Sequence, residues 1–193
     1  MTGTWATGWA TGDIVTAAEF KKTAGSIFDT TLGASAANID VTGISNTYAH
    51  LMVSIYARAD VAAATTGCFM QFNGDTAANY DYQELTAIAA VASATETFAA
   101  TSVLLGGIPA NTAGANLFGS IETFIPHYAG TANNKQYVSL ASRKAGTTTG
   151  LLGVHIFGGG WRSTAAINRI TFLPPAAANF VSGTRVTIHA LGA

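Results

Sequence analysis

The strongest constraint in this sequence is a two-residue alternation of apolar and polar side chains that recurs along most of the chain. It is clearest over residues 49–58, where alanine, leucine, valine and isoleucine alternate with more polar neighbours. Successive side chains of a strand point to opposite faces of its sheet, so this period is typical of a strand with one buried face. From about residue 37 onward we therefore expect a chain built mainly from β-strands.

Eight further segments show the same texture, and turn residues separate them. The segments cover residues 68–73, 80–85, 97–105, 117–126, 136–143, 151–157, 167–173 and 184–191. Turns or flexible connections are predicted at Asn73-Gly74-Asp75, Gly106-Gly107, 131–134, Gly158-Gly159-Gly160 and Ser182-Gly183. Residues 86–100 are ambiguous between a short helix and a loop that crosses between sheets. About nine or ten strands without strong helical patterns between them predict an all-β antiparallel sandwich or barrel. A jelly-roll-type sandwich is preferred, with an up-and-down barrel as the alternative.

A different pattern precedes this β region. Thr16-Ala17-Ala18-Glu19 fits a helix capping box, in which the Thr and Glu side chains satisfy backbone N–H groups of the first turn. Phe20, Ile27 and Phe28 follow on one face at helical spacing. These features predict a helix over residues 16–30, which is too short to be stable alone and must dock on another surface.

The first dozen residues carry Trp5 and Trp9 in a glycine-rich, quasi-repetitive segment. These side chains either pack back on their own chain or contact a partner subunit, where tryptophan is a favoured residue. We therefore assign residues 1–36 to an anchoring and assembly arm and residues 37–193 to the β-sandwich domain. The expected partner contacts are Trp5, Trp9, Phe20, Ile27 and Phe28.

Charged side chains are scarce. Nine Lys or Arg and ten Asp or Glu make up 10% of the 193 residues, against about 25% in ordinary soluble domains. A chain of this kind is expected to cover much of its surface with copies of itself or with a neighbour, which favours a homo-oligomer. The net charge of −1 and the absence of clustered basic residues argue against nucleic acid as a partner. No apolar run reaches the length of a membrane helix and no signal-peptide pattern occurs, so no membrane partner is expected.

Catalytic and metal-binding patterns are not evident. His50, His155 and His189 lie inside alternating segments, where a structural or interface role is preferred, although three histidines that met across strands would suit a metal. No nucleophile elbow, phosphate-binding loop or dinucleotide motif occurs, and the carboxylates are thinly spread. Cys68 lies in an apolar run and is expected to be a buried, inert thiol. We expect no enzymatic activity, no cofactor and no metal.

One cluster of oxygen-bearing residues partly matches the spacing of a calcium-binding loop. Its members are Asn73, Asp75, Asn79, Asp81 and Glu84. Ala78 occupies the position where such a loop needs glycine for its sharp turn. The segment is therefore interpreted as a hairpin turn.

Four aromatic residues are candidates for stacking on a ligand such as a host glycan, because aromatic rings offer flat apolar faces with polar edges. They are Tyr80, Tyr82, Tyr128 and Trp161. The same residues would equally suit a plain protein–protein interface.

Three stretches, taken in order, carry a family resemblance. Trp9-Ala10-Thr11-Gly12-Asp13-Ile14-Val15-Thr16-Ala17-Ala18 is the first, and Phe72-Asn73-Gly74-Asp75-Thr76-Ala77-Ala78-Asn79-Tyr80 is the second. The last runs from Ile167-Asn168-Arg169-Ile170-Thr171-Phe172 to a closing strand. Together they resemble structural proteins of tailed bacteriophages. The end departs from the family pattern, because His189-Ala190-Leu191-Gly192 stands where Tyr-Gly is common.

The resemblance implies a virion structural protein with a jelly-roll-like module, commonly trimeric, carried on the tail or the head of the particle. It implies other virion proteins as partners and brings no catalytic residues. We expect an appendage anchored by its N-terminal segment, with a tail fibre or baseplate component slightly favoured. A capsid decoration protein and a module that binds a host receptor or glycan are the alternatives.

Overall fold

The computed structural model describes residues 25–192. Twelve strands and no helix occur in this part of the chain, so the expectation of an all-β protein is confirmed. In chain order the strands are β1 Ser26–Thr31, β2 Ile39–Thr42, β3 His50–Ala57, β4 Thr65–Phe72, β5 Tyr80–Ile88, β6 Val91–Ala100, β7 Val103–Pro109, β8 Gly119–Pro126, β9 Lys135–Lys144, β10 Leu152–Trp161, β11 Arg169–Leu173 and β12 Arg185–Leu191. Among the described residues, no helix is long and apolar enough to cross a membrane.

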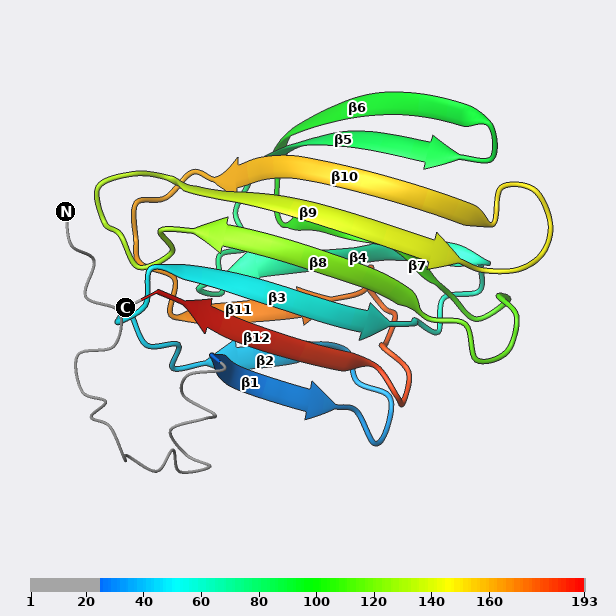
Figure 1. Ribbon diagram of the computed structural model, residues 1–193, viewed down its shortest axis with the longest axis horizontal. Helices are drawn as coiled ribbons and strands as arrows, with labels where there is room; N and C mark the ends of the chain where they lie inside the picture. Colours follow the sequence, from blue (N-terminus) through cyan, green and yellow to red (C-terminus); the bar gives the residue numbers. More distant parts are fainter. Residues whose placement is uncertain (1–24, 193) are drawn as a thin grey trace, which may run out of the picture.

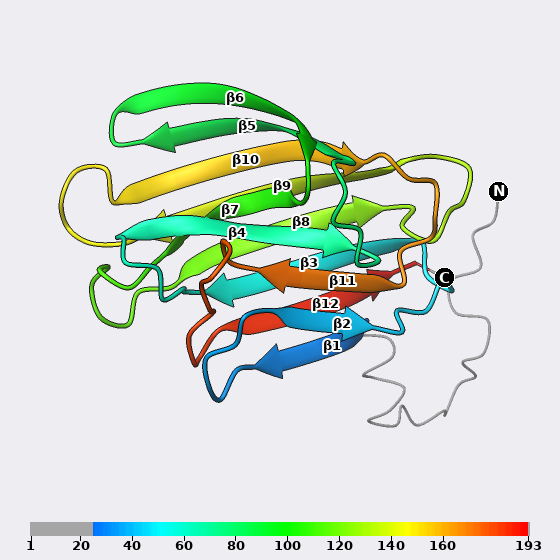
Figure 2. The ribbon, with the colours of Figure 1, turned by 180° about the vertical axis from the view of Figure 1, so that it is seen from behind.

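The strands form two antiparallel sheets that pack face to face as a β-sandwich (Figures 1 and 2). The larger sheet has eight strands in the order β1-β12-β3-β8-β9-β10-β5-β6. The smaller sheet has four, in the order β2-β11-β4-β7. The larger sheet therefore extends past the smaller one, and β6 at its edge is exposed along nearly its whole length.

Strand pairing is nested in sequence order. The first strand of the chain pairs with the last, and strands that lie further inside the sequence pair with one another. β1 pairs with β12, β2 with β11, β3 with β8 and β4 with β7, all antiparallel. Two hairpins interrupt this scheme, β5–β6 between β4 and β7, and β9–β10 between β8 and β11. Both hairpins join the larger sheet, where β5 pairs with β10.

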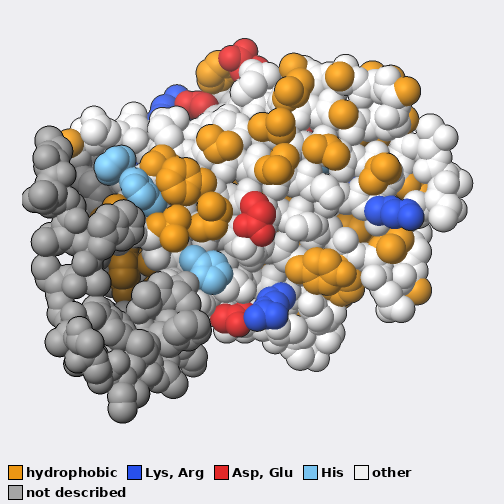
Figure 3. Space-filling view, viewed as in Figure 1, with side chains coloured by type: hydrophobic (Ala, Val, Ile, Leu, Met, Phe, Trp, Pro, Cys, Tyr) orange, Lys and Arg blue, Asp and Glu red, His pale blue; other side chains and the backbone are white. Residues whose placement is uncertain are grey.

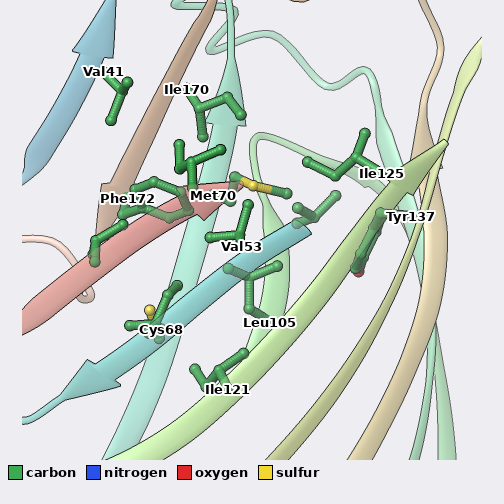
Figure 4. Packing of buried hydrophobic residues seen from close by; sticks show 14 of the residues in the cluster. Val41, Val53, Cys68, Met70, Leu105, Ile121, Ile125, Tyr137, Ile170 and Phe172 are labelled. Atoms are coloured by element: carbon green, nitrogen blue, oxygen red, sulfur yellow. The ribbon is translucent and has the colours of Figure 1, made fainter. Parts of the chain in front are cut away.

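The hydrophobic core lies between the two sheets, and it follows from the alternation seen in the sequence. In β9, for example, buried and exposed residues alternate without exception. Figure 4 shows side chains from both sheets meeting in this layer, among them Val53, Met70, Leu105 and Phe172. All four are essentially inaccessible to water, and burial of each contributes about 1.5–3 kcal/mol.

The predicted N-terminal helix is wrong over residues 26–30, which belong to strand β1. Phe28 pairs with Ile188 of β12, and both Ile27 and Phe28 pack against the core cluster. The free edge of β12 supplies backbone partners along the whole segment, and this tertiary pairing outweighs a weak local helical pattern. Strand β1 thus joins the larger sheet although it lies within the segment assigned to the arm. Residues 16–24 of the predicted helix lie outside the described residues.

Several predicted turns are also wrong. Gly106-Gly107 lies inside β7, and Gly158-Gly159-Gly160 lies inside β10. Residues 86–100 form the end of β5 and all of β6, whereas residues 97–105 are divided between β6 and β7. Asn73-Gly74-Asp75 does form a turn, with positive φ angles at Asn73 and Gly74. This turn is not part of a hairpin, because it connects β4 of the smaller sheet to β5 of the larger one. Glycine in a strand often marks a close approach of another chain segment, which local turn rules do not capture.

Candidate functional site

The four aromatic residues predicted to face a ligand lie mainly in the protein interior. Tyr80 and Tyr128 are fully buried, and Trp161 is only 4% exposed. Tyr82 is partly buried and packs against the core cluster. The expectation of open stacking platforms is therefore wrong for Tyr80, Tyr128 and Trp161.

Two of these rings take part in a hydrogen-bonded cluster around Asp75. The indole Nε1 of Trp161 donates to Asp75 Oδ2 over 2.7 Å, and the amide Nδ2 of Asn79 donates to the same oxygen over 2.9 Å. The Tyr80 hydroxyl donates to the backbone oxygen of Asp75 over 3.0 Å. The bonds from Asn79 and Trp161 hold the pKa of the Asp75 carboxyl below its ordinary value, and burial raises the pKa of Tyr80 to about 12. The oxygen atoms considered for calcium thus stabilise the connection between β4 and β5.

A recess of about 240 Å³ opens where β5, β6, β9 and β10 lie side by side, at the Trp161 end of β10. Gly159 and Gly160 of β10 line it. Gly160 pairs with Asp81 on one side and Gln136 on the other, and both of these residues also line the recess. A Cβ atom on Gly160 would lie 2.7 Å from Gln136 Nε2, so glycine allows the Gln136 side chain to lie across this position.

The walls of this recess combine one exposed aromatic ring with polar side chains. Phe98 of β6 is 66% exposed, and Gln83, Glu96 and Gln136 line the same recess. Asp81 is fixed in place, because its Oδ1 accepts a hydrogen bond from the backbone N–H of Ala99 over 2.8 Å. The Nε of Arg162 lies 3.4 Å from Asp81 Oδ2.

This arrangement suits a small polar ligand with an apolar face, because amide and carboxylate groups can bind hydroxyls while a ring stacks on the ligand. Of the predicted aromatics, Tyr82 and Trp161 contribute to the lining. Phe98 was not predicted. The available signal was the glycine run in an otherwise β-forming segment, which indicates a close approach or a ligand.

A second surface feature covers the outer face of the larger sheet. Five aliphatic side chains, each about half exposed, come from three neighbouring strands; they are Leu85, Val138, Leu140, Val154 and Ile156. Leu140 pairs with Ile156, which in turn pairs with Leu85, so the side chains form one continuous patch. Figure 3 shows hydrophobic side chains spread over this face with few charges between them. We call these five residues the outer patch.

The predicted partner contacts are only partly within the described residues. Ile27 and Phe28 lie in β1 and are partly buried against the core of their own chain. Trp5, Trp9 and Phe20 lie outside the described residues.

Within residues 25–192, no group of three or more His, Cys, Asp or Glu residues lies close enough together to hold a metal ion. Cys68 is fully buried, and burial raises the pKa of its thiol to about 12. No protein-family model matches the chain, and a comparison with curated proteins finds no match.

Proposed function

We propose that the sandwich is a jelly roll enlarged by two inserted hairpins. Removing β5–β6 and β9–β10 leaves eight strands, with β1-β12-β3-β8 in one sheet and β2-β11-β4-β7 in the other. This order of nested pairs is what two interleaved Greek keys produce, and the jelly roll is defined by it. The nested pairing is the observation that carries the proposal.

We further propose that the protein is a structural component of a bacteriophage particle. Jelly rolls are common in viral capsid proteins, and the sequence resemblance to tailed-phage proteins points the same way. In this proposal the residues before β1 anchor the chain to other virion proteins, and the sandwich projects outward. A tail fibre or baseplate position is slightly favoured over capsid decoration. The role is structural and needs no catalytic residue or cofactor.

The outer patch supports self-association as part of this role. A continuous group of half-exposed aliphatic side chains is unusual on a monomer surface and is typical of an interface. A carboxylate placed in its centre would be desolvated in an oligomer, so Ile156→Glu is expected to give a monomer where the wild type forms a trimer. Thr42→Glu, at an exposed position of the smaller sheet, is the matched control and is expected to leave the mass unchanged. Sedimentation equilibrium measures the mass, and a monomeric wild type would contradict self-association.

Location is tested on purified particles with labelled antibody under the electron microscope. Label at the tail supports a fibre or baseplate component, and label over the shell supports a decoration protein. Absence of label from intact particles would refute the virion proposal. Deletion of residues 1–24 tests the anchor, because it removes the segment before β1; we expect a folded sandwich that is no longer incorporated.

A second candidate function is glycan binding at the recess around Phe98, favoured by its exposed ring beside amide and carboxylate groups. Phe98→Ala is expected to weaken binding to host cells without changing the oligomer mass. Leu152→Ala, which also removes an exposed apolar side chain but lies outside this recess, is the matched control. Equal binding by both variants and the wild type would exclude Phe98 from such a site.

A further inference from the structure

Another recess lies between the two sheets, where β7 of the smaller sheet packs against β9 and β10 of the larger one (Figure 2). It has a volume of about 190 Å³. The larger sheet contributes Glu84, Arg143 and His155 to its lining, and the smaller sheet contributes Thr65, Thr66 and Gly107. Its lining thus combines a cation, a histidine and a carboxylate in a mainly buried position.

Two polar atoms in this recess are buried and unpaired. Arg143 is 6% exposed and His155 is 5% exposed. Neither Arg143 Nη1 nor His155 Nε2 has a hydrogen-bond partner among the described residues. Buried polar groups are nearly always paired, and a buried guanidinium is especially unfavourable without an acceptor. Burial lowers the pKa of Arg143, and the charge of Glu84 offsets only part of this shift.

The Arg143 guanidinium and His155 Nε2 lie close together. A Cβ atom on Gly153 would lie 3.2 Å from His155 Nε2 and 3.3 Å from Arg143 Cζ. A Cβ atom on Gly107 would lie 2.6 Å from Arg143 Nε and 3.1 Å from His155 Nε2. Any larger residue at position 107 or 153 would therefore crowd these side chains.

The proton on His155 is directed by its partners on β5. Nδ1 lies 2.9 Å from Glu84 Oε1 and 3.0 Å from Thr86 Oγ1. An ionised carboxylate only accepts hydrogen bonds, so the proton on Nδ1 makes this nitrogen the donor of the hydrogen bond to Glu84. Nε2 is then an acceptor in the neutral ring and a donor in the protonated ring. When protonated, His155 presents an N–H beside the unpaired Nη1 of Arg143.

We propose that this recess binds a small oxyanion, such as a carboxylate, sulfate or phosphate group, through Arg143 Nη1 and the protonated Nε2 of His155. Charge-assisted hydrogen bonds of this kind are the strong ones, and arginine is favoured for carboxylate and phosphate. Glu84 is a positioning residue that holds the ring and its proton. This inference is independent of the proposed virion role.

The site couples binding to proton uptake. The titratable groups that line it are Glu84 from β5, Arg143 from β9 and His155 from β10. The facing strands β4 and β7 contribute threonine, glycine and leucine to the lining and no titratable group. Because Nε2 must gain a proton to donate, binding of an anion is expected to be accompanied by uptake of a proton.

The test is titration of the full chain with sulfate by isothermal calorimetry in buffers of different ionisation enthalpy, which measures the protons taken up on binding. We expect saturable binding accompanied by proton uptake. Arg143→Met, which keeps an unbranched apolar stem and removes the guanidinium with its charge, is expected to weaken binding at least about tenfold. Lys144→Met removes a positive charge from the next residue, which is exposed on the opposite face, and is expected to bind as the wild type does.

NMR of the wild type gives a second measurement in case Arg143→Met does not fold. Sulfate is expected to shift the Arg143 Nε and His155 ring signals with the same saturation curve. Acetate as an additional probe distinguishes a site for planar anions from one for tetrahedral anions, and binding of either supports the proposal. Absence of saturable binding of both anions, or equal sulfate affinity in the wild type and Arg143→Met, would overturn it.

Discussion

Replacement of Gly106 by alanine is expected to separate the two sheets locally and to destabilise the protein. Gly106 lies in β7 of the smaller sheet, and it faces Ala141 in β9 of the larger one. A Cβ atom built on Gly106 would lie well under 3.0 Å from Cβ of Ala141 and 3.3 Å from Cδ1 of Ile121. Carbon atoms in contact are about 3.5–4.0 Å apart, and neither Cβ can rotate away because each is fixed to its backbone.

The strands must therefore move apart, and packing around them is lost. Overpacking of this kind costs about 1–3 kcal/mol in free energy of unfolding. For a chain of this size a loss of about 2 kcal/mol corresponds to a decrease in Tm of about 4–8 °C. Thermal and urea unfolding followed by circular dichroism measure both quantities.

Two further variants make the reasoning specific to this contact. Gly158→Ala adds the same methyl group to β10 where no atom lies within 4 Å of the new Cβ, so its effect is expected to stay within about 0.5 kcal/mol. Ala141→Gly in the Gly106→Ala background removes the opposing methyl and is expected to restore most of the lost stability, as coupled neighbours do. Equal stability of Gly106→Ala and Gly158→Ala, or no recovery in the double variant, would refute the steric explanation.

Three other predictions concern Asp75, Cys68 and Ser139. The pKa of the Asp75 carboxyl is lower in the folded chain than its ordinary value, so the stabilisation that it contributes is present above about pH 4 and is lost as the pH falls through the folded pKa. Asp75→Asn is therefore expected to lower the free energy of unfolding at pH 7 by about 1–2 kcal/mol and to make stability less dependent on pH on the acid side, as urea unfolding at a series of pH values would measure. An unchanged pH dependence on the acid side would contradict this. Cys68, buried and with its pKa raised to about 12, is expected to resist iodoacetamide in the native protein and to react fully in denaturant, as mass spectrometry would measure; rapid native alkylation would disprove its burial. Ser139→Ala is expected to cost about 1–3 kcal/mol in urea unfolding, because the buried hydroxyl donates to the backbone oxygen of Leu105 over 2.8 Å and lies 2.9 Å from Thr123 Oγ1; a neutral effect would show that these groups find other partners.

Local pattern in the sequence was sufficient to identify most of the strands. The alternation over residues 49–58 corresponds to β3, and the alternation over 136–143 corresponds to β9. The period of two is a property of the strand itself, so it is visible before any partner is known. Scarcity of charge indicated a surface covered by other copies or by a neighbour, which stays a prediction. The large aliphatic side chains of the outer patch were identified only from the structure.

The glycine runs show where local reasoning stops. Gly106-Gly107 and Gly158-Gly159-Gly160 are typical of turns in isolation, yet both lie inside strands. Gly106 is required by Ala141 on the facing sheet, and Gly160 is required by the close approach of Lys135 and Gln136 in the neighbouring strand. The reason for each glycine is a neighbour distant in sequence, which no local rule contains.

Within the candidate sites the same division holds. The sequence alone was enough to predict that residues 37–192 are made mainly of strands, that many of these strands bury one apolar face, and that Cys68 is buried. Only the tertiary structure decided that Ser26–Thr31 is a strand, that it pairs with the last strand, and that Arg143 and His155 meet between the sheets. The alternation of side chains along a strand is a local property of the sequence. Strand pairing instead depends on which sheet edges and faces the rest of the chain leaves available, and so it is decided only when the whole sandwich is assembled.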